Sequence, residues 1–260
     1  MRRYALCRDG QIHLRDHGAA DAPVIAFFHQ TASSGAMFDR VAEYLGEYRC
    51  IAFDTPGFGG SYQPEAIPDV RYLADRLLEA FDDLGIDQFH ACGHHTGGCV
   101  ALEMATARPD RVRSLSIIGP VVATEDEKAV YRKTFVRPFA VEESGAFLQT
   151  AWDYLRMIGA GTDVELHRRE MVDHLIAHAT MPMAFSAVWS QDVAGLLRSV
   201  SVPLMLMCSR DDVLWPLFER ACALRSDAAT AIVGGADFQP DRDPQGVAKA
   251  LAGFIGSLAG

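Results

Sequence analysis

Short apolar runs alternate with amphipathic helical patterns along most of the chain, and this alternation constrains the fold more than any other feature. The runs are mostly apolar, and that of residues 24–28 is continuously so, as expected of strands that are buried on both faces of a parallel sheet. Strands that alternate with helices predict an α/β fold with a mostly parallel, doubly wound sheet and right-handed crossovers. The predicted strands cover residues 24–28, 50–53, 89–92, 112–118, 203–208 and 229–233.

Several of the intervening helices have recognisable ends. Asp69 is a predicted N-cap for a helix that Gly85 terminates, and Asp243-Pro244 provides the N-cap and first turn of a C-terminal helix. Ser33 and Ser34 are expected to cap another helix, which follows the first predicted strand.

The segment from residue 121 to residue 200 contains no clear parallel strand and instead carries helical patterns. We interpret it as a helical cap inserted into a core formed by residues 1–120 and 201–260. Most of its large apolar side chains are expected to form the core of the cap itself, and a subset to roof a pocket for an apolar or aromatic ligand. These side chains are Phe135, Phe139, Phe147, Trp152, Tyr154, Met157, Met171, Met181, Met183, Phe185 and Trp189.

Composition and charge narrow the class of partner. Asp and Glu outnumber Lys and Arg by 34 to 24 in 260 residues, so the net charge is −10, which disfavours binding to nucleic acid. No apolar stretch approaches the roughly 20 residues that span a bilayer, and Arg8 and Asp9 interrupt the first apolar run. The 6 cysteines include no C-x-x-C pair and are typical of buried thiols in a reducing compartment. We therefore expect a cytoplasmic protein that binds a small molecule, with no nucleic-acid or membrane partner; a homodimer is left open.

The densest motif is Gly93-His94-His95-Thr96-Gly97-Gly98, which follows a predicted strand and begins a predicted helix. A strand, a sharp turn flanked by glycines and a helix resemble the nucleophile elbow of the α/β-hydrolase superfamily, in which G-x-S-x-G is expected. Its order and spacing, together with the motifs below, resemble a cap-bearing, single-domain member of that superfamily across nearly the whole chain. The resemblance implies an α/β-hydrolase fold.

Four further segments resemble superfamily motifs. Residues 27–30 are similar to the oxyanion loop, and residues 53–61 to an Asp-x-x-Gly-x-Gly-x-Ser turn. Residues 209–216 are similar to the turn that carries the catalytic acid, which aligns Asp212 with that acid. Residues 234–238 occupy the place of the Gly-His-Phe segment with the catalytic histidine. The resemblance implies an oxyanion hole formed by the amides of Gln30 and Thr96; His29 and Trp215 are further candidates for contact with the substrate.

Two residues depart from the superfamily pattern. His95 stands at the nucleophile position, and Asp237 stands where the catalytic histidine is expected. An aspartate beside an imidazole fixes its tautomer and raises its basicity, so the pair predicts a general base without a covalent nucleophile. We assign Asp237 as the direct partner of His95 and Asp212 as a supporting group.

This constellation predicts an enzyme that hydrolyses an ester, a lactone or a carbon–carbon bond of a small apolar or aromatic carbonyl compound, without a cofactor. The same pair of residues would serve a lyase, a cyclase or a cofactor-free oxygenase, and a non-catalytic ligand-binding protein is a further alternative. His29, His95, Asp212 and Asp237 include suitable metal ligands, but no metal-specific spacing connects them, so no metal site is predicted.

Overall fold

A computed structural model describes residues 1–135 and 141–258 and contains one eight-stranded sheet. The strand order is β1-β2-β4-β3-β5-β6-β7-β8. β1 pairs with β2 and β2 with β4 in antiparallel fashion, whereas all other neighbouring strands are parallel. The strands are β1 (Arg2–Cys7), β2 (Gly10–His17), β3 (Val24–Phe28), β4 (Arg49–Phe53), β5 (Phe89–His94), β6 (Val112–Ile118), β7 (Leu204–Cys208) and β8 (Ala229–Ile232).

All six predicted strands are confirmed, whereas the hairpin of β1 and β2 is absent from the sequence prediction. In β1 only Ala5 is fully buried, and its neighbours Tyr4 and Leu6 are exposed. The hairpin lies at the edge of the sheet, so its strands need no continuous apolar run.

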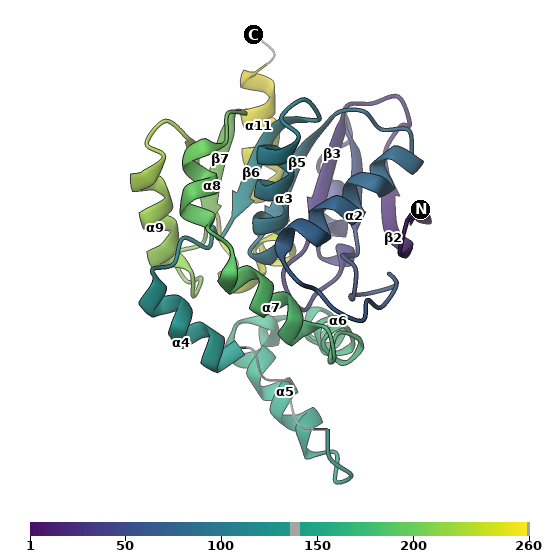
Figure 1. Cartoon of the computed structure of the whole chain (residues 1–260), viewed down its shortest axis with the longest axis vertical. Coiled ribbons are helices and arrows are strands. Elements are labelled where there is room, and N and C mark those ends of the chain that lie inside the picture. Colours follow the sequence, from purple (N-terminus) through teal and green to yellow (C-terminus); the bar gives the residue numbers. More distant parts are fainter. Residues whose placement is uncertain (136–140, 259–260) are drawn as a thin grey trace.

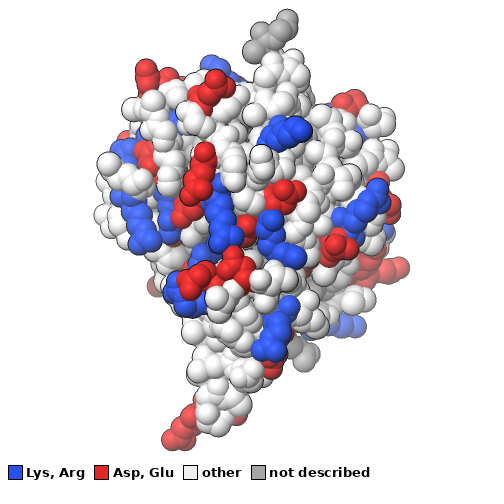
Figure 2. Space-filling view, turned by 180° about the vertical axis from the view of Figure 1, so that it is seen from behind, with Lys and Arg blue, Asp and Glu red and all other residues white. Residues whose placement is uncertain are grey.

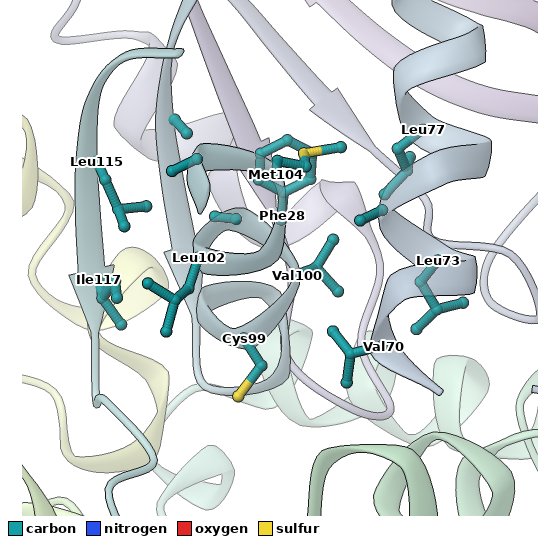
Figure 3. Packing of buried hydrophobic residues seen from close by; sticks show 14 of the residues in the cluster. Phe28, Val70, Leu73, Leu77, Cys99, Val100, Leu102, Met104, Leu115 and Ile117 are labelled. Carbon is teal, nitrogen blue, oxygen red and sulfur yellow. The ribbon is translucent and has the colours of Figure 1, made fainter. Parts of the chain in front are cut away.

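Helices cover both faces of the sheet (Figure 1). One face is packed by α2 (Val70–Asp83), α3 (Thr96–Ala107), α8 (Val193–Ser199) and α9 (Trp215–Leu224), and the other by α1 (Asp39–Ala42) and α11 (Pro244–Ser257). Figure 3 shows α3 between β6 and α2: Leu102 points toward Leu115 and Ile117, and Val100 toward Val70. This packing fixes the start of α3, and with it the turn between β5 and α3, against the sheet.

Two of the predicted helix N-caps are confirmed and the third prediction is not. Asp69 accepts a hydrogen bond from the amide of Tyr72 at 2.8 Å, and Asp243 accepts one from the amide of Gly246 at 3.0 Å. The predicted capping role of Ser33 and Ser34 is wrong. Ser34 precedes the short helix η1 (Gly35–Phe38), but its hydroxyl makes no cap bond there.

The described residues between β6 and β7 form five helices and one 3₁₀ turn: α4 (Glu125–Phe135), α5 (Ala146–Met157), η2 (Ala160–Thr162), α6 (Val164–Ile176), α7 (Met181–Ser190) and α8. Figure 1 shows α4, α5, α6 and α7 gathered beyond one end of the sheet, whereas α8 runs beside α9. Because β5 leads into the start of α3 at that end, these helices face the carboxyl ends of the parallel strands. Phe139, one of the predicted pocket residues, lies outside the described residues.

Buried charges join α6 to the core. The hydroxyls of Ser33 and Ser34 donate to Glu170 and Asp173, each at 2.8 Å. Arg169 pairs with Asp241 of α10 (Gln239–Arg242) at 2.6 Å and also bonds to Glu170. Burial and the neighbouring Glu170 raise the pKa of Asp173 to about 7. The Arg169 guanidinium thus lies near three carboxyls in a region from which water is largely excluded; these belong to Glu170, Asp173 and Asp241.

Asp173→Asn is expected to stabilise the protein more at pH 8 than at pH 5. A carboxyl with a raised pKa in the folded state binds more protons there than in the unfolded chain, so its contribution to stability falls as pH rises from about 4 toward 7. The asparagine keeps an acceptor for Ser34 and has no proton to lose. Denaturant unfolding should give a gain on the order of 1–3 kcal/mol larger at pH 8 than at pH 5. Glu143→Gln, which removes an exposed carboxyl, is the control; equal effects of the two variants at both pH values would contradict this prediction.

Charges of both signs are interspersed on the face shown in Figure 2, and the narrow end of the molecule in that view is mostly uncharged. Among the described residues, no helix has both the length and the apolar character needed to cross a membrane.

Candidate active site

A cavity of about 490 Å³ lies between the carboxyl ends of the strands and the helices α4–α7. The described residues that line it include no Lys or Arg, and apolar side chains form most of its wall. Six of the predicted pocket residues line it: Phe135, Tyr154, Met157, Met181, Phe185 and Trp189. An uncharged, largely apolar ligand fits such a wall better than an anion does.

His95 occupies the sharp turn between β5 and α3. Its backbone has φ +47° and ψ −109°, a conformation that side chains rarely adopt. The turn is held because the His95 amide donates to the carbonyl of Ile118 at 2.9 Å. Gly119 follows β6, and a Cβ atom there would collide with Cδ2 and Nε2 of His95. The absence of a side chain at residue 119 lets the imidazole lean across the end of β6 toward β7.

Asp212, rather than Asp237, is the direct partner of His95. Nε2 of His95 lies 2.9 Å from Oδ2 of Asp212, a residue of the turn after β7. The sequence assignment of Asp237 as the direct partner is therefore wrong, and Asp212 takes that place. Burial opposes the charged form of the imidazole, but the carboxylate of Asp212 outweighs it, so the pKa of His95 is raised.

The remaining contacts of Asp212 keep it ionised. Its Oδ1 accepts a hydrogen bond from the amide of Leu214 at 2.6 Å, and its Oδ2 accepts one from Nε2 of Gln239 at 2.5 Å. Burial alone would raise its pKa, but His95 and the Leu214 amide lower it to about 2. With Asp212 as acceptor, Nε2 of His95 carries the proton. Within residues 1–135 and 141–258 no group bonds to Nδ1 of His95, whose side chain is 13 % exposed on the cavity wall.

Gln239 links this pair to a second histidine and was not identified from the sequence. Its Oε1 lies 2.7 Å from Nε2 of His94, which is fully buried. Burial and the adjacent His95 lower the pKa of His94 well below its usual value, so His94 is neutral and donates to Gln239. The only sequence signal is a polar amide between Phe238 and Pro240, in a segment that resembles a superfamily motif.

Asp237 lies on the cavity wall without a hydrogen bond to His95. Its Oδ1 accepts a hydrogen bond from the amide of Val213 at 3.0 Å, which holds the carboxyl on the other side of the turn that carries Asp212. Burial raises its pKa to about 6 against the opposing effect of His95. Asp237 is thus a second, chemically different carboxyl in the same cavity.

Gln30 and Thr96 both line the cavity, and their amides donate to no group in the described part of the chain. Thr31 donates from its hydroxyl to that of Thr96 at 2.9 Å. The prediction that His29 contacts the substrate is not supported, because His29 is not among the described residues that line the cavity. It is buried beneath the loop, with Nδ1 2.7 Å from the carbonyl of Gln30 and Nε2 accepting from the amide of Thr55 at 2.9 Å. Its role is to position the Gln30 carbonyl.

Trp215 is also not among the described cavity-lining residues. Its ring lies at a tilted angle to that of Phe218, with a centroid distance of 5.1 Å, and the guanidinium of Arg210 lies 4.9 Å from its centre. Trp215 therefore anchors the turn that carries Asp212 to the start of α9.

The four residues with suitable metal-ligand atoms that the sequence analysis considered do not form one ligand set, because both ring nitrogens of His29 are bonded elsewhere. Among the described residues, ligand atoms of His94, His95 and Asp212 lie within 4.8 Å of one another. Nε2 of His94, Nε2 of His95 and both oxygens of Asp212 already take part in the hydrogen bonds described above.

Comparisons with known proteins agree with this architecture. A family model for the alpha/beta hydrolase fold matches residues 23–145. The chain is 28 % identical over 217 residues to a protein of Pseudomonas savastanoi pv. phaseolicola named as a carbamate hydrolase, RutD, with 79 % of this chain and 81 % of the relative covered. It is 27 % identical to the carboxylesterase YbfK of Bacillus subtilis, with 97 % of this chain and 88 % of the relative covered.

The crystal structure of a hydrolase from Pseudomonas aeruginosa PA01 superimposes with a TM-score of 0.81 at 20 % identity, covering 98 % of each chain. The chain has the α/β-hydrolase fold.

Proposed function

We propose that the protein is a hydrolase of a small, largely apolar carbonyl compound, in which His95 acts as general base and Asp212 orients it. The observation that carries the proposal is the 2.9 Å contact between Nε2 of His95 and Asp212, with the opposite edge of the ring on the wall of an apolar cavity. Relatives named as a carbamate hydrolase and a carboxylesterase support a carbonyl substrate.

The mechanism depends on which ring nitrogen of His95 carries the proton. Because Asp212 holds the proton on Nε2, Nδ1 of His95 is the basic atom and accepts a proton from water. The resulting hydroxide attacks the carbonyl carbon, and the amides of Gln30 and Thr96 donate to the oxygen that becomes negative. The general base supplies about 10²–10⁴-fold acceleration.

No side chain at the turn is an evident nucleophile for the formation of a covalent acyl-enzyme. The elbow side chain is an imidazole, and the nearest hydroxyl in sequence, that of Thr96, is bonded to Thr31 rather than to His95. Direct attack by water therefore fits the side chains at the turn better than the two-step route through an ester.

The proposal is tested by incubating the protein with the 4-nitrophenyl, phenyl and methyl esters of phenylacetic acid, which suit an apolar cavity. We expect catalytic turnover, with kcat/KM falling at low pH, where the His95 ring carries two protons. Because Asp212 raises the pKa of His95, the imidazole should keep its second proton to above pH 6.5, the ordinary histidine value. Stoichiometric retention of the esters without product would instead support a ligand-binding protein. Exchange of α-protons with deuterium without ester cleavage would support the lyase alternative, which uses the same base.

A further inference from the structure

Asp237 is a buried carboxyl that the hydrolytic step leaves unused. The residue is 5 % exposed and forms part of the cavity wall, yet His95 bonds to Asp212 instead. A buried carboxyl needs a partner for each oxygen or a proton on one of them.

Only one oxygen of Asp237 has a described protein partner. Oδ1 accepts from the amide of Val213 at 3.0 Å, and in the part of the chain that the structure describes nothing bonds to Oδ2. No described Lys or Arg lines the cavity to stabilise a negative charge there. A protonated carboxyl fits this setting, because its carbonyl oxygen accepts from the amide while its O–H donates into the cavity.

The charged and titratable groups near Asp237 act on it in opposite directions. His95 favours the ionised form, whereas Asp212, on the same turn as Val213, opposes it, and the dominant effect is burial, which raises the pKa to about 6. Burial raises the pKa of Tyr154 of α5 to about 12 and also raises that of Cys208 of β7, and the nearby charge of Asp237 adds to both shifts. None of these neighbours is a fixed cation.

We infer that Asp237 is the general acid of this site. The proton on its Oδ2 goes to the leaving group while His95 takes a proton from water. This inference rests on the proposed function. The C–O bond to the attacking water oxygen forms and the bond from the carbonyl carbon to the leaving group breaks. One water proton goes to Nδ1 of His95, and the Asp237 proton goes to the departing oxygen. Transfer of the proton from His95 back to Asp237 through water restores the starting state.

The inference predicts a bell-shaped dependence of kcat/KM on pH. In the active form the Asp237 carboxyl is protonated and Nδ1 of His95 is not, so the two groups together hold one exchangeable proton. Below the acidic limb both groups are protonated and the base is lost, and above the alkaline limb both are deprotonated and the acid is lost.

The test compares Asp237→Asn with wild type on the 4-nitrophenyl and methyl esters of phenylacetic acid. Asparagine keeps an acceptor for the Val213 amide but carries no acidic proton. 4-Nitrophenolate leaves without protonation, whereas methoxide does not. We therefore expect kcat/KM for the methyl ester to fall by about 10²–10⁴-fold and that for the 4-nitrophenyl ester to fall far less, with loss of the alkaline limb. Asp211→Asn, which changes an exposed carboxyl of the same turn, is the control.

Equal losses on the two esters would overturn the general acid and assign Asp237 an electrostatic or structural role. An ester adduct on Asp237, detected by mass spectrometry during turnover, would overturn it in favour of a nucleophile. If wild type cleaves neither ester, the proposed function fails, and infrared titration then decides the state of Asp237. A protonated-carboxyl band that is present at pH 5, lost at pH 8 and missing in Asp237→Asn supports the inference, and its absence overturns it.

Discussion

His95→Gln is expected to lower kcat/KM for the phenylacetate esters by about 10²–10⁴-fold, with the same proportional loss for good and poor leaving groups. Glutamine can still donate a hydrogen bond to Asp212, which is buried and needs its donors. It cannot accept a proton at neutral pH, so water is no longer activated. The effect should lie mainly in kcat, because the base acts in the chemical step rather than in ground-state binding.

His178→Gln provides the matched control for this substitution. His178 lies just beyond α6, is partly exposed and is not among the described residues that line the cavity. Its replacement should leave kcat/KM unchanged. Wild-type turnover by His95→Gln would contradict the proposed role of His95, provided that both variants have wild-type circular dichroism and unfolding midpoints.

Asp212→Asn is expected to reduce kcat/KM by a comparable factor of about 10²–10⁴ and to displace the acidic limb. The carboxylate raises the pKa of His95, so its loss should lower that pKa and move the limb to lower pH. An asparagine amide also can donate to Nε2 of His95. That contact would place the proton on Nδ1, the atom that must accept one from water.

The shift of the acidic limb separates this role from a structural one. A variant that merely loosened the turn would lose activity at every pH without moving the limb. Asp211→Asn, at the preceding exposed residue, should change neither the limb nor the rate. An unshifted acidic limb in Asp212→Asn would contradict the assignment of Asp212 as the partner that sets the basicity of His95.

The sheet was predictable from the sequence because its central strands are buried on both faces. Residues 24–28 are continuously apolar for that reason, residues 112–118 are apolar or small apart from Arg113, and the structure has strands in both places. The hairpin of β1 and β2 was not predictable in the same way. Its strands lie at the edge of the sheet and carry Arg, His and Asp among a few buried apolar residues.

The sequence names His95, Asp212 and Asp237 as candidates, but it does not determine which carboxyl pairs with His95. Asp212 and Asp237 both follow strands next to one another in the sheet, and sequence position alone does not say which carboxyl reaches the imidazole. The choice depends on contacts that the sequence does not encode locally. The amide of Val213 captures Asp237, and the bare Cα of Gly119 leaves room for the His95 ring to approach Asp212. Gln239, which bonds to Asp212 from the following turn, belongs to the same class of non-local contact.

The most direct measurement of the central claim is ¹⁵N NMR of histidine-labelled protein, with the His95 signals assigned by comparison with His95→Gln. It requires no knowledge of the substrate. Above the pKa of His95 we expect a protonated Nε2 and an unprotonated Nδ1, and we expect Nδ1 to gain a proton as the pH falls through that raised pKa. A proton on Nδ1 of the neutral ring, or an Nδ1 signal that does not change over that range, would contradict the assignment of His95 as the base.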